Sequence, residues 1–168
     1  MKVLITGGTG VTSSGAQAEA LARGYELYLL NRGNSNSRVL PGAKVLSADY
    51  TDEAATKAAI GDLVFDAVVD FRVMNVAALE KAVRIFSGHT KQYIFISSGT
   101  VYQKPLPSYI VTEDAPLGNV HSAYARNKLL ENELQLVYKS CARKGTRNYL
   151  YIYEQILFIK YIKGKANK

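Results

Sequence analysis

The stretch Lys2-Val-Leu-Ile-Thr-Gly-Gly-Thr-Gly-Val-Thr-Ser-Ser-Gly15 decides the fold. Its apolar run predicts a buried strand, and the segment Ala16 to Arg23 that follows is rich in helix-forming residues. A strand, a glycine turn and a helix in this order present a helix N-terminus to a pyrophosphate. Gly7 would permit the tight turn, and Gly10 would let the backbone approach the phosphates without a Cβ in the way. The stretch therefore predicts a dinucleotide-binding site, and a plain strand-to-helix turn is the alternative interpretation.

The length and composition are those of an ordinary globular protein. The chain has 168 residues, about one domain, with 48% hydrophobic and 21% charged residues. Its single cysteine, Cys141, can form no internal disulfide, and no His, Cys or carboxylate pair has metal-site spacing. There is no cleavable signal pattern and no apolar run of the ~20 residues that a membrane span needs. We expect a cytoplasmic, soluble protein with no metal site and no membrane partner.

The positive charge is confined to the end of the chain. The formal net charge is +7, yet residues 1–138 contain 13 Lys+Arg and 13 Asp+Glu. Residues 139–168 carry eight Lys+Arg against Glu154 alone. We therefore divide the chain into a domain over 1–138 and an atypical basic tail over 139–168. A basic tail is compatible with nucleic acid, which we treat as the least favoured hypothesis.

Strands and helices alternate along the domain. After the first strand and helix, the pattern predicts strands over 25–30, 44–47, 63–70 and 92–97, and helices over 52–60, 76–86 and 121–138. This rhythm is typical of a doubly wound parallel α/β sheet with helices on both faces, in three layers. Residues 103–120 hold three of the four prolines and predict a long loop with a functional role.

The ends of the second and third strands bear on the choice of cofactor. In the dinucleotide fold an acidic residue about 20 positions past the glycines grips the ribose 2′-hydroxyl, and here Asn31 stands at that place with Arg32 beside it. A missing carboxylate and an adjacent guanidinium favour NADP over NAD, unless Arg32 is simply a solvated loop residue. Asp49 follows the third strand, where either an adenine contact or a turn-capping role suits it.

Tyr124 and Lys128 are the residues that best fit catalysis. They are four apart, so a helix places them on one face. An ammonium group stabilises a nearby phenolate, which suits Tyr124 to acid–base chemistry. Ser98 follows the strand over 92–97, at the edge where open α/β sheets bind ligands, and its hydroxyl would hold a substrate oxygen. A merely exposed Tyr–Lys pair is the alternative.

The sequence resembles the short-chain dehydrogenase/reductase superfamily, in its extended branch of NAD(P)-dependent nucleotide-sugar epimerases and dehydratases. Five motifs carry the resemblance: Ile5-Thr-Gly-Gly-Thr-Gly10, Asn31-Arg-Gly33, Ile96-Ser-Ser-Gly-Thr-Val-Tyr102, Glu113-Asp-Ala-Pro116 and Tyr124-Ala-Arg-Asn-Lys128. The resemblance implies a Rossmann fold and a catalytic triad of Ser98, Tyr124 and Lys128, with Lys128 also holding the nicotinamide ribose and Asp49 contacting the adenine. The expected cofactor-binding residues are Gly7, Gly8, Thr9, Gly10, Val11, Asn31, Arg32, Asp49, Tyr50, Phe71, Ser97, Tyr124 and Lys128.

The sequence departs from the family pattern in three places. Ser13 replaces the third glycine, which strains close helix–strand packing. Arg72 stands where family members mostly carry a small residue, and it would either crowd the cofactor or bind a phosphate. Beyond residue 138 no Arg-Pro strand end and no substrate lobe follow. We hypothesise a frame shift or truncation near residues 139–148, with the tail supplying a sixth strand over 148–153 and a short helix to Ile162.

Three functions remain as hypotheses. The first is an NAD(P)-dependent oxidoreductase or epimerase that acts on a nucleotide sugar or another hydroxyl or carbonyl substrate. The second is a catalytically impaired, cofactor-binding remnant without a substrate domain. The third is an RNA-binding relative that uses the basic tail. Apolar surface left by a missing lobe would favour homo-oligomers.

Overall fold

The computed structural model describes residues 1–34, 36–106, 111–112, 115–130 and 147–151. The described elements alternate along the chain. They are β1 (Lys2–Thr6), α1 (Val11–Ala22), β2 (Glu26–Asn31), the 3-10 turn η1 (Asn36–Arg38), β3 (Lys44–Ser47), α2 (Glu53–Ile60), β4 (Ala67–Asp70), α3 (Val76–Phe86), β5 (Gln92–Ile96), the 3-10 turn η2 (Gly99–Val101) and β6 (Arg147–Tyr151). Residues 123–130 are also helical. This βα rhythm confirms the predicted fold class.

The strands form one parallel sheet in the order β3-β2-β1-β4-β5-β6. The chain winds outward from β1 to β3 on one side and from β4 to β6 on the other, which is the doubly wound arrangement of a Rossmann fold. The order reverses between β1 and β4, where Thr6 pairs with Asp70. Ligands of open α/β sheets bind at such a switch point, outside the carboxyl ends of the strands.

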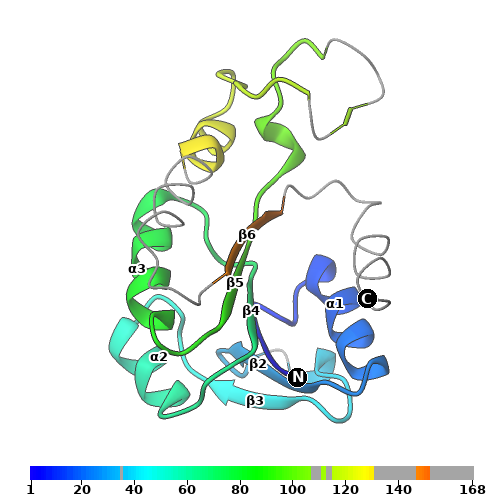
Figure 1. The fold of residues 1–168 in the computed structure, drawn as a ribbon, viewed down its shortest axis with the longest axis vertical. Helices are drawn as coiled ribbons and strands as arrows, with labels where there is room; N and C mark the ends of the chain where they lie inside the picture. The colour runs from blue at the N-terminus through cyan, green and yellow to red at the C-terminus, as the bar shows by residue number, and fades with distance from the viewer. Residues whose placement is uncertain (35, 107–110, 113–114, 131–146, 152–168) are drawn as a thin grey trace.

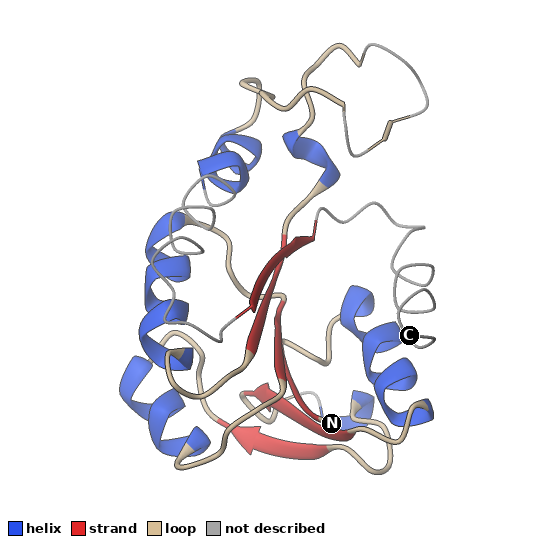
Figure 2. Cartoon of the chain, in the orientation of Figure 1, coloured by secondary structure: helices blue, strands red, loops and turns tan. Residues whose placement is uncertain are grey.

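Helices cover both faces of the sheet (Figures 1 and 2). Helix α1 lies on one face, and α2 and α3 lie on the other. On the α1 face, Ala16 and Ala20 pack against strand residues that include Ile5 and Leu29. On the opposite face, a larger core joins Ile60, Leu79, Ala82, Ile85 and Phe86 to the strands. Because both faces are buried, the central strands carry apolar residues on both faces, as at Leu4, Ile5, Val68 and Val69.

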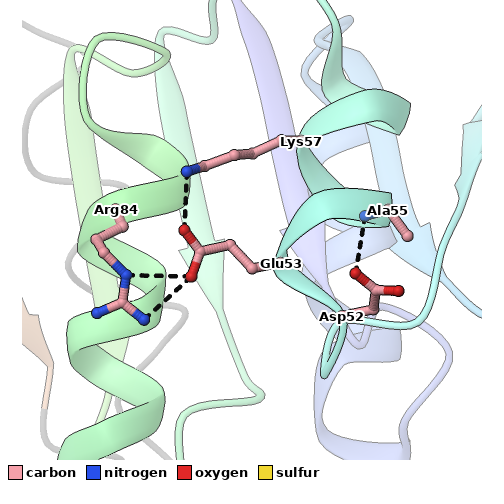
Figure 3. A network of polar contacts seen from close by, with 5 residues as sticks. All are labelled: Asp52, Glu53, Ala55, Lys57 and Arg84. Atoms are coloured by element: carbon pink, nitrogen blue, oxygen red, sulfur yellow. Dashed lines mark hydrogen bonds and ion pairs between the residues drawn. The ribbon is translucent and has the colours of Figure 1, made fainter.

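Charged residues tie α2 to α3 (Figure 3). Asp52 caps the N-terminus of α2 by accepting a 2.9 Å hydrogen bond from the Ala55 amide. The Glu53 carboxylate forms ion pairs with Lys57 of its own helix, at 2.8 Å, and with Arg84 of α3, at 3.0 Å. Hydrogen bonds from Lys57 and then Arg84 hold the pKa of the Glu53 carboxyl below its usual value. The pair of helices therefore presents a polar, ion-paired surface.

Several observed boundaries differ from the predicted ones. Helix α1 begins at Val11 rather than Ala16, because Gly10 serves as its N-cap and the polar first turn is helical. The strand predicted over 63–70 is shorter, since Phe65 only bridges to Thr90 before β4 starts at Ala67. The ranges 44–47 and 76–86 match β3 and α3.

The end of the chain is described only in part. Strand β6 overlaps the sixth strand predicted over 148–153 and lies beside β5 in the same sheet. The predicted helix to Ile162, and the part of the 121–138 helix after residue 130, lie outside the described residues. Among the described helices, none combines the length and the apolar character that crossing a membrane requires.

Candidate functional site

The glycine loop between β1 and α1 lies at the switch point of the sheet. Gly7 adopts a φ of 67°, which an L side chain rarely tolerates, and its amide donates to Leu30 O at 3.1 Å. At Gly8 an added Cβ would lie 2.6 Å from Cδ2 of Leu29, so the loop backbone packs directly on β2. Gly10 ends the turn as the N-cap of α1 and offers no side-chain acceptor to the helix amides. The loop thus brings bare backbone and a helix N-terminus to the strand edge.

Ser13 stabilises the glycine loop through hydrogen bonds to two of its carbonyl groups. Its side chain is buried, and its hydroxyl donates to the Gly7 carbonyl at 2.7 Å and to the Gly10 carbonyl at 3.2 Å. The residue that replaces the third glycine is therefore accommodated, because its small hydroxyl finds acceptors inside the turn. Val11, the first residue of α1, is 85% exposed, and the Thr9 carbonyl accepts a long 3.5 Å hydrogen bond from Arg38.

Asn31 and Arg32 lie beside the loop, at the end of β2. Asn31 Oδ1 accepts a 2.8 Å hydrogen bond from the Gly33 amide, while its Nδ2 is buried and meets no partner among the described residues. Arg32 is exposed, and no ion pair joins it to another described residue. A buried amide without an acceptor is costly in a folded protein and points to a ligand or water at this position.

Asp49 and Tyr50, after β3, face in different directions. Asp49 Oδ1 accepts from the Thr51 amide and hydroxyl, both at 2.8 Å, and so caps a turn. These bonds, followed by the charges of Arg32 and Arg72, hold the pKa of the Asp49 carboxyl below its usual value. Tyr50 turns into the core, where its ring stacks on Phe86. Of these two predicted cofactor residues, only Asp49 keeps its side chain at the strand edge.

Asp70 is a buried polar centre that sequence reasoning missed. Its Oδ1 accepts from the Thr6 hydroxyl at 2.5 Å and from the Arg72 amide at 2.8 Å. Its Oδ2 accepts from the hydroxyls of Tyr50 and Tyr93. One carboxylate therefore links β1, the β3–α2 turn, β4 and β5 below the glycine loop. The sequence signal for this centre was a carboxylate directly after the buried run Ala67-Val-Val, because a buried charge requires partners.

Phe71, the next residue, is half-buried and packs on the α1 face.

Ser97 and Ser98 follow β5. The Ser97 side chain is buried, and its hydroxyl has no partner among the described residues. Ser98 caps the turn η2, with its Oγ accepting from the Thr100 amide at 3.3 Å and the Thr100 hydroxyl at 3.0 Å. The Ser98 hydroxyl keeps its own proton to donate, so it is equipped to hold a substrate oxygen.

Tyr124 and Lys128 share one face of the helical segment 123–130, as their spacing predicts. The Lys128 side chain is 2% exposed, and its Nζ donates to the carbonyls of Val73 and, at 3.2 Å, of Ile96. These carbonyls follow β4 and end β5, so the lysine docks the helix on the carboxyl edge of the sheet. Its Nζ lies 5.9 Å from the ring centroid of Tyr124 and 4.5 Å from that of Phe95. Tyr124 itself is 42% exposed.

The carboxyl edge thus gathers most of the predicted residues. The glycine loop, Asn31, Arg32, Asp49 and the serines lie at the ends of β1, β2, β3 and β5, and Lys128 brings Tyr124 to the same edge. The side chain of Tyr50 does not join them. A dinucleotide fits this edge, because the loop brings the exposed Gly10 and the N-terminus of α1 to it. Asn31 Nδ2 and Ser97 Oγ are also buried polar atoms without protein partners in the described part of the chain.

Comparisons with known proteins agree with this geometry. The model of the family described as "NAD dependent epimerase/dehydratase family" matches residues 3–82. A UDP-glucose 4-epimerase from Klebsiella pneumoniae is 31% identical over 128 residues, which cover 61% of this chain and 92% of that protein. A UDP-glucose 4-epimerase from Bacillus subtilis is 29% identical over 160 residues, covering 80% of this chain and 47% of that protein.

Solved structures share the fold. The UDP-glucose 4-epimerase from Bifidobacterium longum, solved in complex with NAD+ and UDP, superposes with a TM-score of 0.76 at 22% identity, over 91% of this chain and 53% of that one. The chain therefore spans about half the length of this structure and of the Bacillus subtilis relative.

Proposed function

Because this chain belongs to the NAD-dependent epimerase/dehydratase family, we propose that it binds a nicotinamide dinucleotide and catalyses hydride exchange on a nucleotide sugar. The observation that carries the proposal is the placement of Lys128. It anchors the helix of Tyr124 on the carbonyls after β4 and at the end of β5, on the same edge as the glycine loop. A UDP-sugar is the favoured substrate, because the relatives named UDP-glucose 4-epimerase match this chain.

The glycine loop would hold the pyrophosphate, with backbone amides and the N-terminus of α1 facing its charge. Asn31 Nδ2 would donate to the adenosine ribose, and the Ser97 hydroxyl would face the nicotinamide half. Each would gain the partner that the described residues do not supply. A bound nicotinamide supplies the site that accepts and returns hydride.

The remaining chemistry belongs to three side chains. Ser98 donates its hydroxyl proton in a hydrogen bond to the substrate oxygen and so orients it. Tyr124, exposed at the edge, takes the proton of the substrate hydroxyl as hydride leaves the carbon, and returns it in the reverse step. Tyr124 accepts that proton as the phenolate and is a neutral phenol until it returns the proton. The Lys128 ammonium, with its Nζ 5.9 Å from the centroid of the Tyr124 ring, would stabilise the phenolate form.

Arg32 makes NADP the favoured form of the cofactor. A guanidinium without an ion pair among the described residues, next to an amide rather than a carboxylate, suits a 2′-phosphate. The Asp49 carboxylate lies within the field of Arg32 and partly offsets this preference. Arg32→Ala should therefore weaken NADPH binding more than NADH binding.

The proposal is tested by combining binding with turnover. NADH and NADPH are titrated by fluorescence, and interconversion of UDP-glucose and UDP-galactose is measured with the wild type, Tyr124→Phe and Tyr25→Phe. Tyr25 lies just before β2, at the opposite end of the sheet, and is the matched control. We expect dinucleotide binding by all three proteins and turnover by the wild type and the control. Binding without turnover would support dinucleotide binding and reject the proposed catalytic activity. Absence of binding would reject the whole proposal.

A further inference from the structure

Arg72 lies against the glycine loop without contributing to the roles assigned above. It follows β4 by two residues, and its amide donates to Asp70 Oδ1 at 2.8 Å. Because Thr6 and Asp70 are register partners and share a hydrogen bond, the backbone at Arg72 is held next to the start of the glycine loop.

The aliphatic part of the Arg72 side chain covers Gly7. A Cβ built on Gly7 would lie 2.8 Å from Arg72 Cδ and 3.0 Å from its Cγ. A side chain at position 7 would block this close contact. Glycine is therefore required here for two reasons: it leaves room for the aliphatic carbons of Arg72, and it tolerates the positive φ. The stem therefore crosses from β4 over the end of β1.

Arg72 is an exposed residue, although its aliphatic carbons pack on Gly7. Within the described part of the chain, no carboxylate forms an ion pair with it. Its charge nevertheless acts on Asp49, after β3, together with the charge of Arg32. The charge of Arg72 therefore acts at the ends of β2 and β3, where the adenosine half of a dinucleotide would bind.

We propose that Arg72 is a cofactor-binding residue of this site, with its guanidinium binding a phosphate of the dinucleotide from the β4 side. The inference rests on the proposed dinucleotide binding. A planar guanidinium forms paired, charge-assisted hydrogen bonds with phosphate oxygens, and a stem packed on Gly7 loses little further freedom on binding. The phosphate belongs either to the pyrophosphate or to the 2′ position, and the two sources predict different selectivity.

The alternative is that Arg72 merely fills space above Gly7. An uncharged chain of the same length would serve that purpose equally. Arg72→Gln separates the two roles, because it keeps most of the stem over Gly7 and removes the charge. Arg84→Gln is the matched control, since Arg84 is an exposed arginine on α3 whose partner is Glu53.

The experiment measures dissociation constants for NADH and NADPH with the wild type, Arg72→Gln, Arg72→Lys and Arg84→Gln, beside the thermal unfolding midpoint of each without ligand. We expect Arg72→Gln to weaken binding about tenfold, which corresponds to about 1.4 kcal/mol. Arg72→Lys should lose less, and Arg84→Gln should match the wild type. Weakening of both dinucleotides assigns the pyrophosphate, and weakening of NADPH alone assigns the 2′-phosphate.

Unchanged or tighter binding by Arg72→Gln, with the wild type binding normally, would overturn the role of Arg72 and leave the proposed function intact. If the wild type binds neither dinucleotide, the proposed function fails, and the role of Arg72 fails with it. If Arg72→Gln does not fold, Arg72→Lys provides the test. Wild-type affinity of Arg72→Lys for both dinucleotides would overturn the proposed paired hydrogen bonds between the guanidinium and a phosphate.

Discussion

The hydroxyl of Tyr93 donates a 2.8 Å hydrogen bond to Oδ2 of Asp70, which also accepts from Tyr50. Thr6 and the Arg72 amide occupy the other carboxylate oxygen. Four donors from separate segments thus converge on one buried acceptor. Its removal should loosen the carboxyl edge as a unit, because no other described acceptor replaces it.

Asp70→Asn should destabilise the fold by about 1.5–3 kcal/mol, the scale of hydrogen bonds to a charged group. The new amide would present donors to hydroxyls that already donate. Urea unfolding of this variant and of Asp62→Asn, an exposed aspartate on the surface, provides the comparison. Equal unfolding free energies for the two variants would contradict the role given to Asp70.

Tyr50→Phe should change the response to alkaline pH. Burial, and then the charge of Asp70, raise the pKa of the Tyr50 phenol well above its ordinary value. The unfolded phenol loses its proton near pH ~10 while the folded one keeps it, so this contribution to stability is present below pH ~10 and is lost as the pH rises further. The wild type should therefore lose up to about 1.4 kcal/mol per pH unit more than Tyr50→Phe above that pH. Parallel curves of unfolding free energy against pH for the two proteins would refute this.

Gly7→Ala and Gly15→Ala should have opposite effects. Alanine at position 7 must adopt a φ of 67° and place its Cβ 2.8 Å from Arg72 Cδ, so we expect a loss of about 1–2 kcal/mol from the backbone alone. Gly15 lies within α1 with nothing within 4 Å of an added Cβ, and alanine there should stabilise the helix by about 0.5–1 kcal/mol. Thermal unfolding of both variants gives the comparison, and a destabilised Gly15→Ala would show that the two positions do not differ as described.

Lys128→Met should lower both stability and turnover. Methionine leaves the carbonyls of Val73 and Ile96 without their ammonium donor, at a cost of about 1.5–3 kcal/mol. Lys57→Met, which removes only an exposed ion pair, should cost less than about 1 kcal/mol. Urea unfolding tests the first effect and sugar-nucleotide turnover the second. A Lys128→Met protein as stable as Lys57→Met would argue against the docking role.

The sequence predicts the fold well because its signals are local. Apolar runs bounded by turn residues match β3 and α3 in their observed bounds. The strand order confirms the predicted Rossmann-type sheet, and the comparison with known proteins confirms the predicted family. Boundaries differ at element ends, as at α1, which begins at Val11, five residues before the predicted Ala16. The catalytic and cofactor roles of the site residues remain predictions.

The sequence by itself determined the order of strands and helices, the glycine loop and the spacing of Tyr124 and Lys128, because each depends on neighbours within a few positions. Only the tertiary structure decided which side chains meet at the carboxyl edge. Thr6 and Asp70 are 64 residues apart, and Lys128 and Val73 are 55 apart. Strand register sets the first contact, and the packing of the helix 123–130 on the sheet sets the second. Other tertiary contacts place the Tyr50 ring in the core beside Phe86 and the Arg72 side chain over Gly7.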